Sequence, residues 1–141
     1  MEKYWKLDSR IKEINYNNSL KYKKELSEVF EYFDNKITVK DNRWILNFYI
    51  EDKNIGMIFL VWNKITFISS WNYFSKKKIK YLWTYMIYKI LNEISENELI
   101  ISEILEEAIW FYKKVSKNFL KEWYIRKYEF RKNNKKLILY K

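Results

Sequence analysis

The chain has 141 residues, of which 48% are apolar, so it is long enough to bury one hydrophobic core and too apolar to be disordered. It has no cysteine and no histidine, which excludes disulfides, thiol chemistry, zinc sites and histidine-dependent triads. No apolar run approaches the ~18 residues of a membrane span, and the first residues lack the apolar region of a signal peptide. We therefore expect one cytoplasmic domain, residues 1–141, with no membrane partner and no metal.

The N-terminal part is predicted to be partly helical. Residues 6–16 are only weakly periodic and fit either the end of a strand or a helical turn. After Ser19, a plausible N-cap, apolar residues between Tyr22 and Phe33 recur at helical spacing, and a short β-like piece follows at 37–39.

A meander of strands is predicted next. The strands are separated by turn residues and span 43–51, 55–62 and 65–71. In the first strand, every second residue from Trp44 to Ile50 is apolar. The second strand is apolar almost throughout, as in a central strand covered on both faces.

A long amphipathic helix is the clearest predicted element. Its apolar residues from Ile79 to Ile94 follow the i, i+3, i+4, i+7 pattern after a cap at Ser75. A buried strand at 98–104, a helix from about 105 to 117 and a hairpin at 123–140 complete the chain. This order predicts a mixed α/β (α+β) fold, with a mostly antiparallel sheet flanked by helices.

The net charge of +10 is unevenly distributed. Residues 111–141 contain eleven Lys or Arg and two acidic residues, whereas residues 90–110 contain six Glu and no basic residue. This separation predicts a basic face for a polyanion beside an acidic face. Two alternatives stay open: the charges only keep the surface soluble, or the lysines reflect A/T-rich codons, since Lys, Ile, Asn and Tyr make up half of the chain.

The order of elements resembles the acyl-CoA-dependent N-acetyltransferase (GNAT) superfamily from about Trp44 to the C-terminus. Three local patterns carry the resemblance: the pair Ile55-Gly56 at the start of a strand, the A-I-x-F-Y-x-K pattern at 108–114, and the aromatic-aliphatic last strand at 137–140. Gly56 and Ala108 are the only glycine and alanine of the chain, and such residues are kept mainly where a larger side chain does not fit. The resemblance implies a GNAT-like domain.

The resemblance also implies site residues. Tyr112 falls where many family members place a tyrosine that protonates the leaving CoA thiolate, although packing on the sheet is an alternative role. Ahead of the long helix the family has a glycine-rich loop that binds the CoA pyrophosphate through backbone N–H groups. Here lysines stand in place of those glycines, so either acetyl-CoA binds unusually or the site has been abandoned. The implied cofactor-binding residues are Ser75, Lys76, Lys77, Lys78, Ile79 and Lys80.

Nucleic acid is the predicted partner of the basic C-terminal region. Lysine and arginine side chains there are expected to contact phosphates, and two tyrosines of the long helix to stack on bases. Burial of those tyrosines beneath loops is the alternative. The predicted nucleic-acid-binding residues are Lys113, Lys114, Lys117, Lys121, Arg126, Lys127, Arg131, Lys132, Tyr81 and Tyr85.

Two functions are consistent with these features. The first is a non-catalytic GNAT-like protein without cofactor that binds RNA, DNA or a ribonucleoprotein. Phage and mobile-element proteins that inhibit host defence systems in the host cytoplasm often work in this way. The second is an acyl-CoA-dependent N-acyltransferase acting on an amine of tRNA, a modified base or a nucleic-acid-binding protein. The missing glycines favour the first. A third possibility is a protein-binding module that uses exposed aromatics such as Trp5, Trp71 and Trp123.

Overall fold

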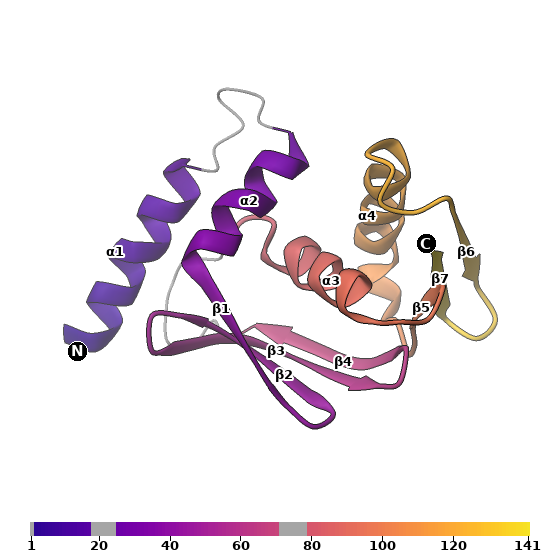
Figure 1. Cartoon of the computed structure of the whole chain (residues 1–141), viewed down its shortest axis with the longest axis horizontal. Coiled ribbons are helices and arrows are strands. Elements are labelled where there is room, and N and C mark those ends of the chain that lie inside the picture. The colour runs from indigo at the N-terminus through magenta and orange to yellow at the C-terminus, as the bar shows by residue number, and fades with distance from the viewer. Residues whose placement is uncertain (1, 18–24, 71–78) are drawn as a thin grey trace. The chain divides into compact units, whose positions relative to one another are not determined.

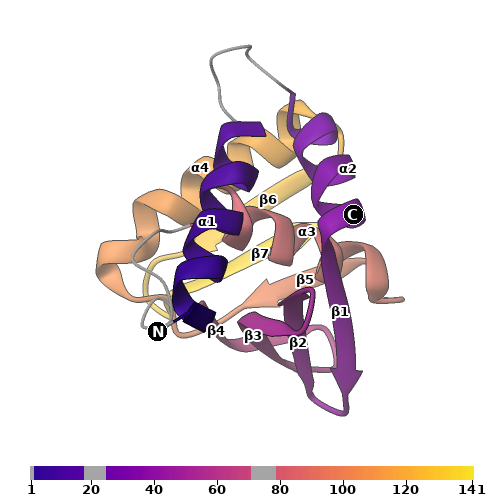
Figure 2. The same ribbon diagram turned by 90° about the vertical axis from the view of Figure 1, so that its left-hand side faces the viewer.

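The computed structural model describes residues 2–17, 25–70 and 79–141, and the side chains from residue 9 onward within them. Within these ranges the fold is mixed α+β, with helices flanking a mostly antiparallel sheet of strand order β1-β2-β3-β4-β5-β7-β6 (Figures 1 and 2). The predicted fold class is therefore confirmed. The elements in chain order are α1 (Glu2–Asn17), α2 (Leu26–Lys36), β1 (Ile37–Asn42), β2 (Ile45–Ile50), β3 (Lys53–Val61), β4 (Lys64–Ser70), α3 (Leu82–Glu93), β5 (Glu98–Ile101), the 3₁₀ turn η2 (Glu106–Ala108), α4 (Ile109–Lys121), β6 (Lys127–Arg131) and β7 (Lys136–Tyr140).

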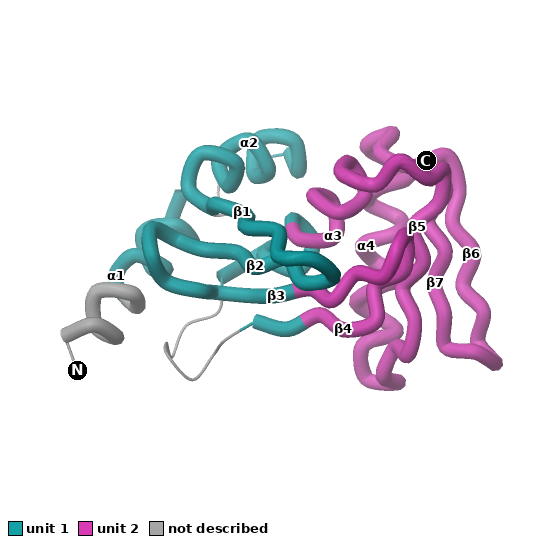
Figure 3. The backbone as a smooth tube through the Cα atoms, turned by 60° about the horizontal axis from the view of Figure 1, so that its bottom comes forward, with its two compact units in different colours: residues 1–57, 69–85 teal, residues 58–68, 86–141 magenta. Residues whose placement is uncertain are grey.

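The chain divides into two compact units (Figure 3). Unit 1 comprises Met1–Met57 and Ser69–Tyr85, and unit 2 comprises Ile58–Ile68 and Met86–Lys141. Strands β3 and β4 and helix α3 contribute residues to both units.

Unit 1 is built around α2 and the β1–β2 hairpin. Helix α2 buries Val29, Phe30 and Phe33 and continues into β1 without an intervening loop, as Figure 1 shows. Tyr85 is completely buried beside these residues, with its ring centroid 5.1 Å from that of Phe33 and its hydroxyl donating to Asp34 Oδ1 at 2.7 Å. This hydrogen bond ties the start of α3 to α2.

Two predictions in unit 1 were wrong. Residues 6–16 are neither a strand end nor a single turn but part of the 16-residue helix α1, which buries Ile11 and Ile14 three residues apart. Trp44 does not lie on the buried face of β2 but in the turn that joins β1 to β2, where it has a positive φ and is exposed. A two-residue hairpin loop favours left-handed backbone in both residues, which matches the angles of Arg43 and Trp44.

Unit 2 contains the sheet β5–β7–β6 and helix α4. Strand β7 pairs antiparallel with both neighbours, and residues on one face, including Leu99, Leu137 and Leu139, are completely buried. Strand β5 also pairs in parallel with β4, but only Lys64 and Ile65 have partners there, at Ile100 and Ile101. Strand β5 then ends, whereas β4 continues to Ser70.

Several boundaries in and near unit 2 differ from the prediction. Within β3, Phe59 and Val61 are exposed, so this strand is not covered on both faces along its length. Helix α4 begins only at Ile109, after the 3₁₀ turn, and extends to Lys121. Among the described helices, none is both long and apolar enough to cross a membrane.

Candidate nucleic-acid interface

Helix α4 has one buried and one exposed face. Tyr112, Val115, Ser116 and Phe119 are buried, and Ser116 Oγ donates to the Tyr112 carbonyl at 2.8 Å. Acidic residues of the preceding 3₁₀ turn lie at the positive end of the helix dipole, and Lys121 lies at its negative end. Sequence and burial therefore position α4 with a defined side facing solvent.

The exposed face carries a lysine stripe, which we define as Lys113, Lys114, Lys117 and Lys121. All four are exposed, and no acidic residue occurs between Ile109 and Lys121. At 100° per residue the four fall, with Trp110, within an arc of about 100°, and Lys113, Lys117 and Lys121 follow one another at a rise of ~6 Å. Trp110 is 72% exposed.

Two stripe lysines lie over aromatic rings. Lys114 Nζ is 5.2 Å from the ring centroid of Trp110, and Lys113 Nζ is 5.3 Å from that of Phe130 in β6. Within the part of the chain that the structure describes, no carboxylate forms an ion pair with a lysine of the stripe. Like charges three or four residues apart cost a helix roughly 0.2–0.5 kcal/mol per pair. The stripe is thus not an arrangement that helix stability favours.

The other predicted basic residues do not share this face. Side chains alternate along β6, so Phe130, which contacts Lys113, points to the α4 side of the sheet. Lys127, Glu129 and Arg131 point to the opposite side. The predicted single basic face is therefore wrong: the basic residues form two groups on opposite faces of the β6–β7 hairpin, with Lys132 exposed in the turn that joins the strands.

The second basic group surrounds Tyr140. Lys127 Nζ is 4.6 Å and Arg126 Cζ 5.6 Å from the ring centroid of Tyr140. Glu129 accepts hydrogen bonds from Arg131 Nε at 3.3 Å and from the Tyr140 hydroxyl at 3.1 Å, and these bonds lower the pKa of its carboxyl. Because this ionised carboxylate lies among the cations, the lysine stripe is the stronger candidate for phosphate contact.

The two predicted stacking tyrosines are poorly placed for that role. Tyr85 is completely buried and bonded to Asp34, so the prediction that it contacts nucleic acid is wrong. Tyr81 is half-buried, with a φ of 66°, and burial raises the pKa of its phenol. In a chain rich in tyrosine, spacing along a helix does not tell a stacking residue from a core residue.

Tyr112, the predicted catalytic acid, is 4% exposed. Burial raises its pKa to about 12. A thiolate has a pKa near 8.5, so proton transfer from this phenol would be uphill by roughly 5 kcal/mol. This geometry supports the packing role, and the catalytic role stays a prediction.

Most of the predicted pyrophosphate site cannot be placed. Ser75, Lys76, Lys77 and Lys78 lie outside the described residues. Ile79 is buried. Lys80 has an exposed side chain, and the backbone N–H of Lys80 donates to Asn15 Oδ1 at 2.9 Å. The amide of Lys80 is therefore already engaged within the protein.

Comparison with known proteins identifies no relative: no protein-family model, no curated protein and no solved structure matches this chain. Over the described residues, no group of three or more acidic side chains is arranged to hold a metal ion.

Sequence reasoning also missed Trp110 as a member of the exposed face. Its position three and four residues before Lys113 and Lys114 is the signal that could have found it.

Proposed function

We propose that this protein binds nucleic acid through the lysine stripe of α4 and does so without catalysing a reaction. The observation that carries the proposal is the stripe itself, four exposed lysines beside an exposed tryptophan on an acid-free helix. A row of ammonium groups at regular rise matches a row of phosphates, and release of counterions supplies the binding free energy.

Two further features support binding rather than acyl transfer. The hydroxyl that would protonate a thiolate is buried and holds its proton tightly. The stripe lysines lack carboxylate partners among the described residues, so their charge is available to a ligand. A protein that covers a nucleic acid without changing it acts by blocking access, and we propose this role, on a GNAT-like scaffold, for the chain.

Fluorescence anisotropy with a labelled single-stranded oligonucleotide tests the proposal between about 50 and 200 mM salt. The test variant replaces Lys113, Lys117 and Lys121 by glutamine. The matched control replaces Lys12, Lys36 and Lys40 of unit 1 by glutamine, which gives the same net charge. Lys36 and Lys40 also lie over rings, those of Tyr32 and Tyr49, so this control also removes cation–π contacts.

Wild type and control are expected to bind with the same strong salt dependence, and the stripe variant to bind weakly. Equal loss in the two variants would mean that only net charge matters and would contradict a defined interface. Absence of binding by the wild type would remove the proposed function.

A further inference from the structure

Helix α4 ends in a Schellman motif that has tryptophan at the position where glycine is usual. The Tyr124 N–H donates to the Phe119 carbonyl at 2.9 Å, and the Trp123 N–H donates to the Leu120 carbonyl at 3.2 Å. The rings of Phe119 and Tyr124 make the accompanying hydrophobic contact, with centroids 5.7 Å apart. Trp123 itself occupies the left-handed position, with a φ of 65°.

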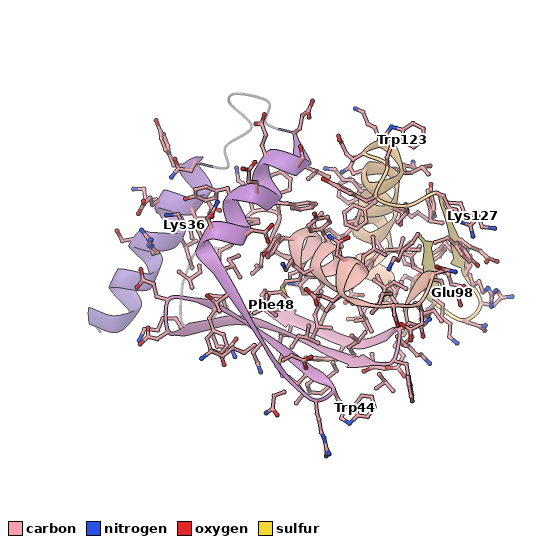
Figure 4. All side chains as sticks on the ribbon, in the orientation of Figure 1. Lys36, Trp44, Phe48, Glu98, Trp123 and Lys127 are labelled. Carbon is pink, nitrogen blue, oxygen red and sulfur yellow. The ribbon has the colours of Figure 1, made fainter. Side chains whose placement is uncertain are left out.

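This placement of Trp123 is unfavourable for the fold. A residue with a Cβ atom is disfavoured in the left-handed region, which is why glycine dominates this site. The indole is 90% exposed, so burial does not offset that cost. Figure 4 shows Trp123 projecting from the ribbon beyond the end of α4. A large aromatic ring is thus presented to solvent at a hydrogen-bonded turn.

Basic residues flank Trp123 in the sequence. The lysine stripe ends two residues before it, at Lys121, and the exposed Arg126 and Lys127 follow it within four residues, with Glu122 as the intervening acid. Trp110 lies at the other end of the stripe. The lysine stripe therefore has an exposed aromatic residue at each end, Trp110 with Lys114 over its ring and Trp123. Single-strand binding sites combine cations that contact the phosphates with aromatic rings on which bases stack.

We propose that Trp123 stacks on an unpaired base, and hence that the ligand class is single-stranded rather than duplex nucleic acid. This inference rests on the proposed function. Stacking of this kind needs a base whose face is free, which a paired strand offers only after the base is flipped out. The lysine stripe holds the phosphates, and the indole adds the contact that a duplex cannot use.

Trp123→Gly separates binding from folding. The variant restores the residue that the turn favours, so its melting temperature is expected to equal or exceed that of wild type, by circular dichroism. Its affinity for a single-stranded oligonucleotide is expected to fall about 10-fold, while the salt slope stays unchanged because no phosphate contact is lost. Trp123→Phe keeps a ring and is expected to retain most of the affinity.

Trp62→Gly is the matched control. Trp62 lies in the β3–β4 turn with a φ of 60° and is 75% exposed, so the change is the same in chemistry, backbone and exposure. Wild-type affinity in this control is expected. Three results would overturn this inference while leaving the proposed function intact. The first is an equal loss of affinity in Trp123→Gly and Trp62→Gly, and the second is an equal affinity of the wild type for duplex and single strand. The third is salt-dependent binding whose affinity does not change in Trp123→Gly. A wild-type chain that binds neither form would overturn the proposed function as well.

Discussion

Replacing Lys117 by glutamate is expected to stabilise the protein and to weaken its binding of nucleic acid at the same time. Lys117 lies in the middle of the lysine stripe, with Lys113 and Lys114 on the preceding turn and Lys121 on the following one. Each of these pairs is three or four residues apart, so the wild-type helix contains three repulsive neighbours of residue 117.

The size of the effect follows from that spacing. In each pair a repulsion of roughly 0.2–0.5 kcal/mol is replaced by an attraction of similar size. The three contributions are not expected to add in full, because the pairs are exposed and all share residue 117. We therefore expect a gain of about 1 kcal/mol in the free energy of unfolding, which corresponds to about 2–4 °C in melting temperature for a chain of this size. Lys117→Gln removes the repulsions without adding attractions and is expected to gain about half as much.

Thermal unfolding followed by circular dichroism at low and high salt measures the stability, since screening removes most of the gain at high salt. Anisotropy with a single-stranded oligonucleotide measures the binding. Loss of one phosphate contact is worth about 5-fold in affinity at about 0.1 M salt, and charge reversal costs more. A glutamate variant that is less stable than wild type, or that binds as tightly, would refute the view that the stripe is kept at the expense of helix stability.

Two further outcomes are expected. Burial raises the pKa of Tyr112 to about 12, so the folded state keeps this proton to a higher pH than the unfolded state does. The free energy of unfolding is therefore expected to fall by roughly 2–3 kcal/mol between about pH 10 and 12. In denaturant titrations, Tyr112→Phe is expected to lose less of its free energy of unfolding over the same pH range. Parallel pH curves for the two proteins would contradict this assignment. Acetyl-CoA is expected to give no binding heat in calorimetry, and micromolar binding would instead support the acyltransferase function.

Periodic elements with a buried face were predictable from sequence. Five of the predicted apolar residues of α3 are buried, namely Leu82, Met86, Ile87, Ile90 and Leu91. The terminal hairpin turns at Asn133-Asn134 as the turn residues indicate. In both cases a local pattern and the final packing select the same conformation. Helix α1 was missed because its sequence has little helical periodicity to detect. Among the side chains that are described in α1, Ile11 and Ile14 are buried.

The candidate site was only partly predictable. Trp44, Trp62 and Trp123 all adopt left-handed turn conformations, and turn prediction looks for glycine, asparagine or aspartate there. The separation of the basic residues into two groups depends on which face of β6 each residue occupies, and that requires the register with β7. Tyr85 was misjudged because its burial depends on α2, which is distant in sequence.

The salt dependence of oligonucleotide binding tests the central claim most directly. Replacing Lys113, Lys117 and Lys121 by glutamine is expected to lower the magnitude of the slope of log K against log salt by about 2, which is about 0.7 for each phosphate contact. The control variant at Lys12, Lys36 and Lys40 is expected to leave the slope unchanged. Equal slopes for the two variants, which have the same net charge, would contradict a binding surface on α4.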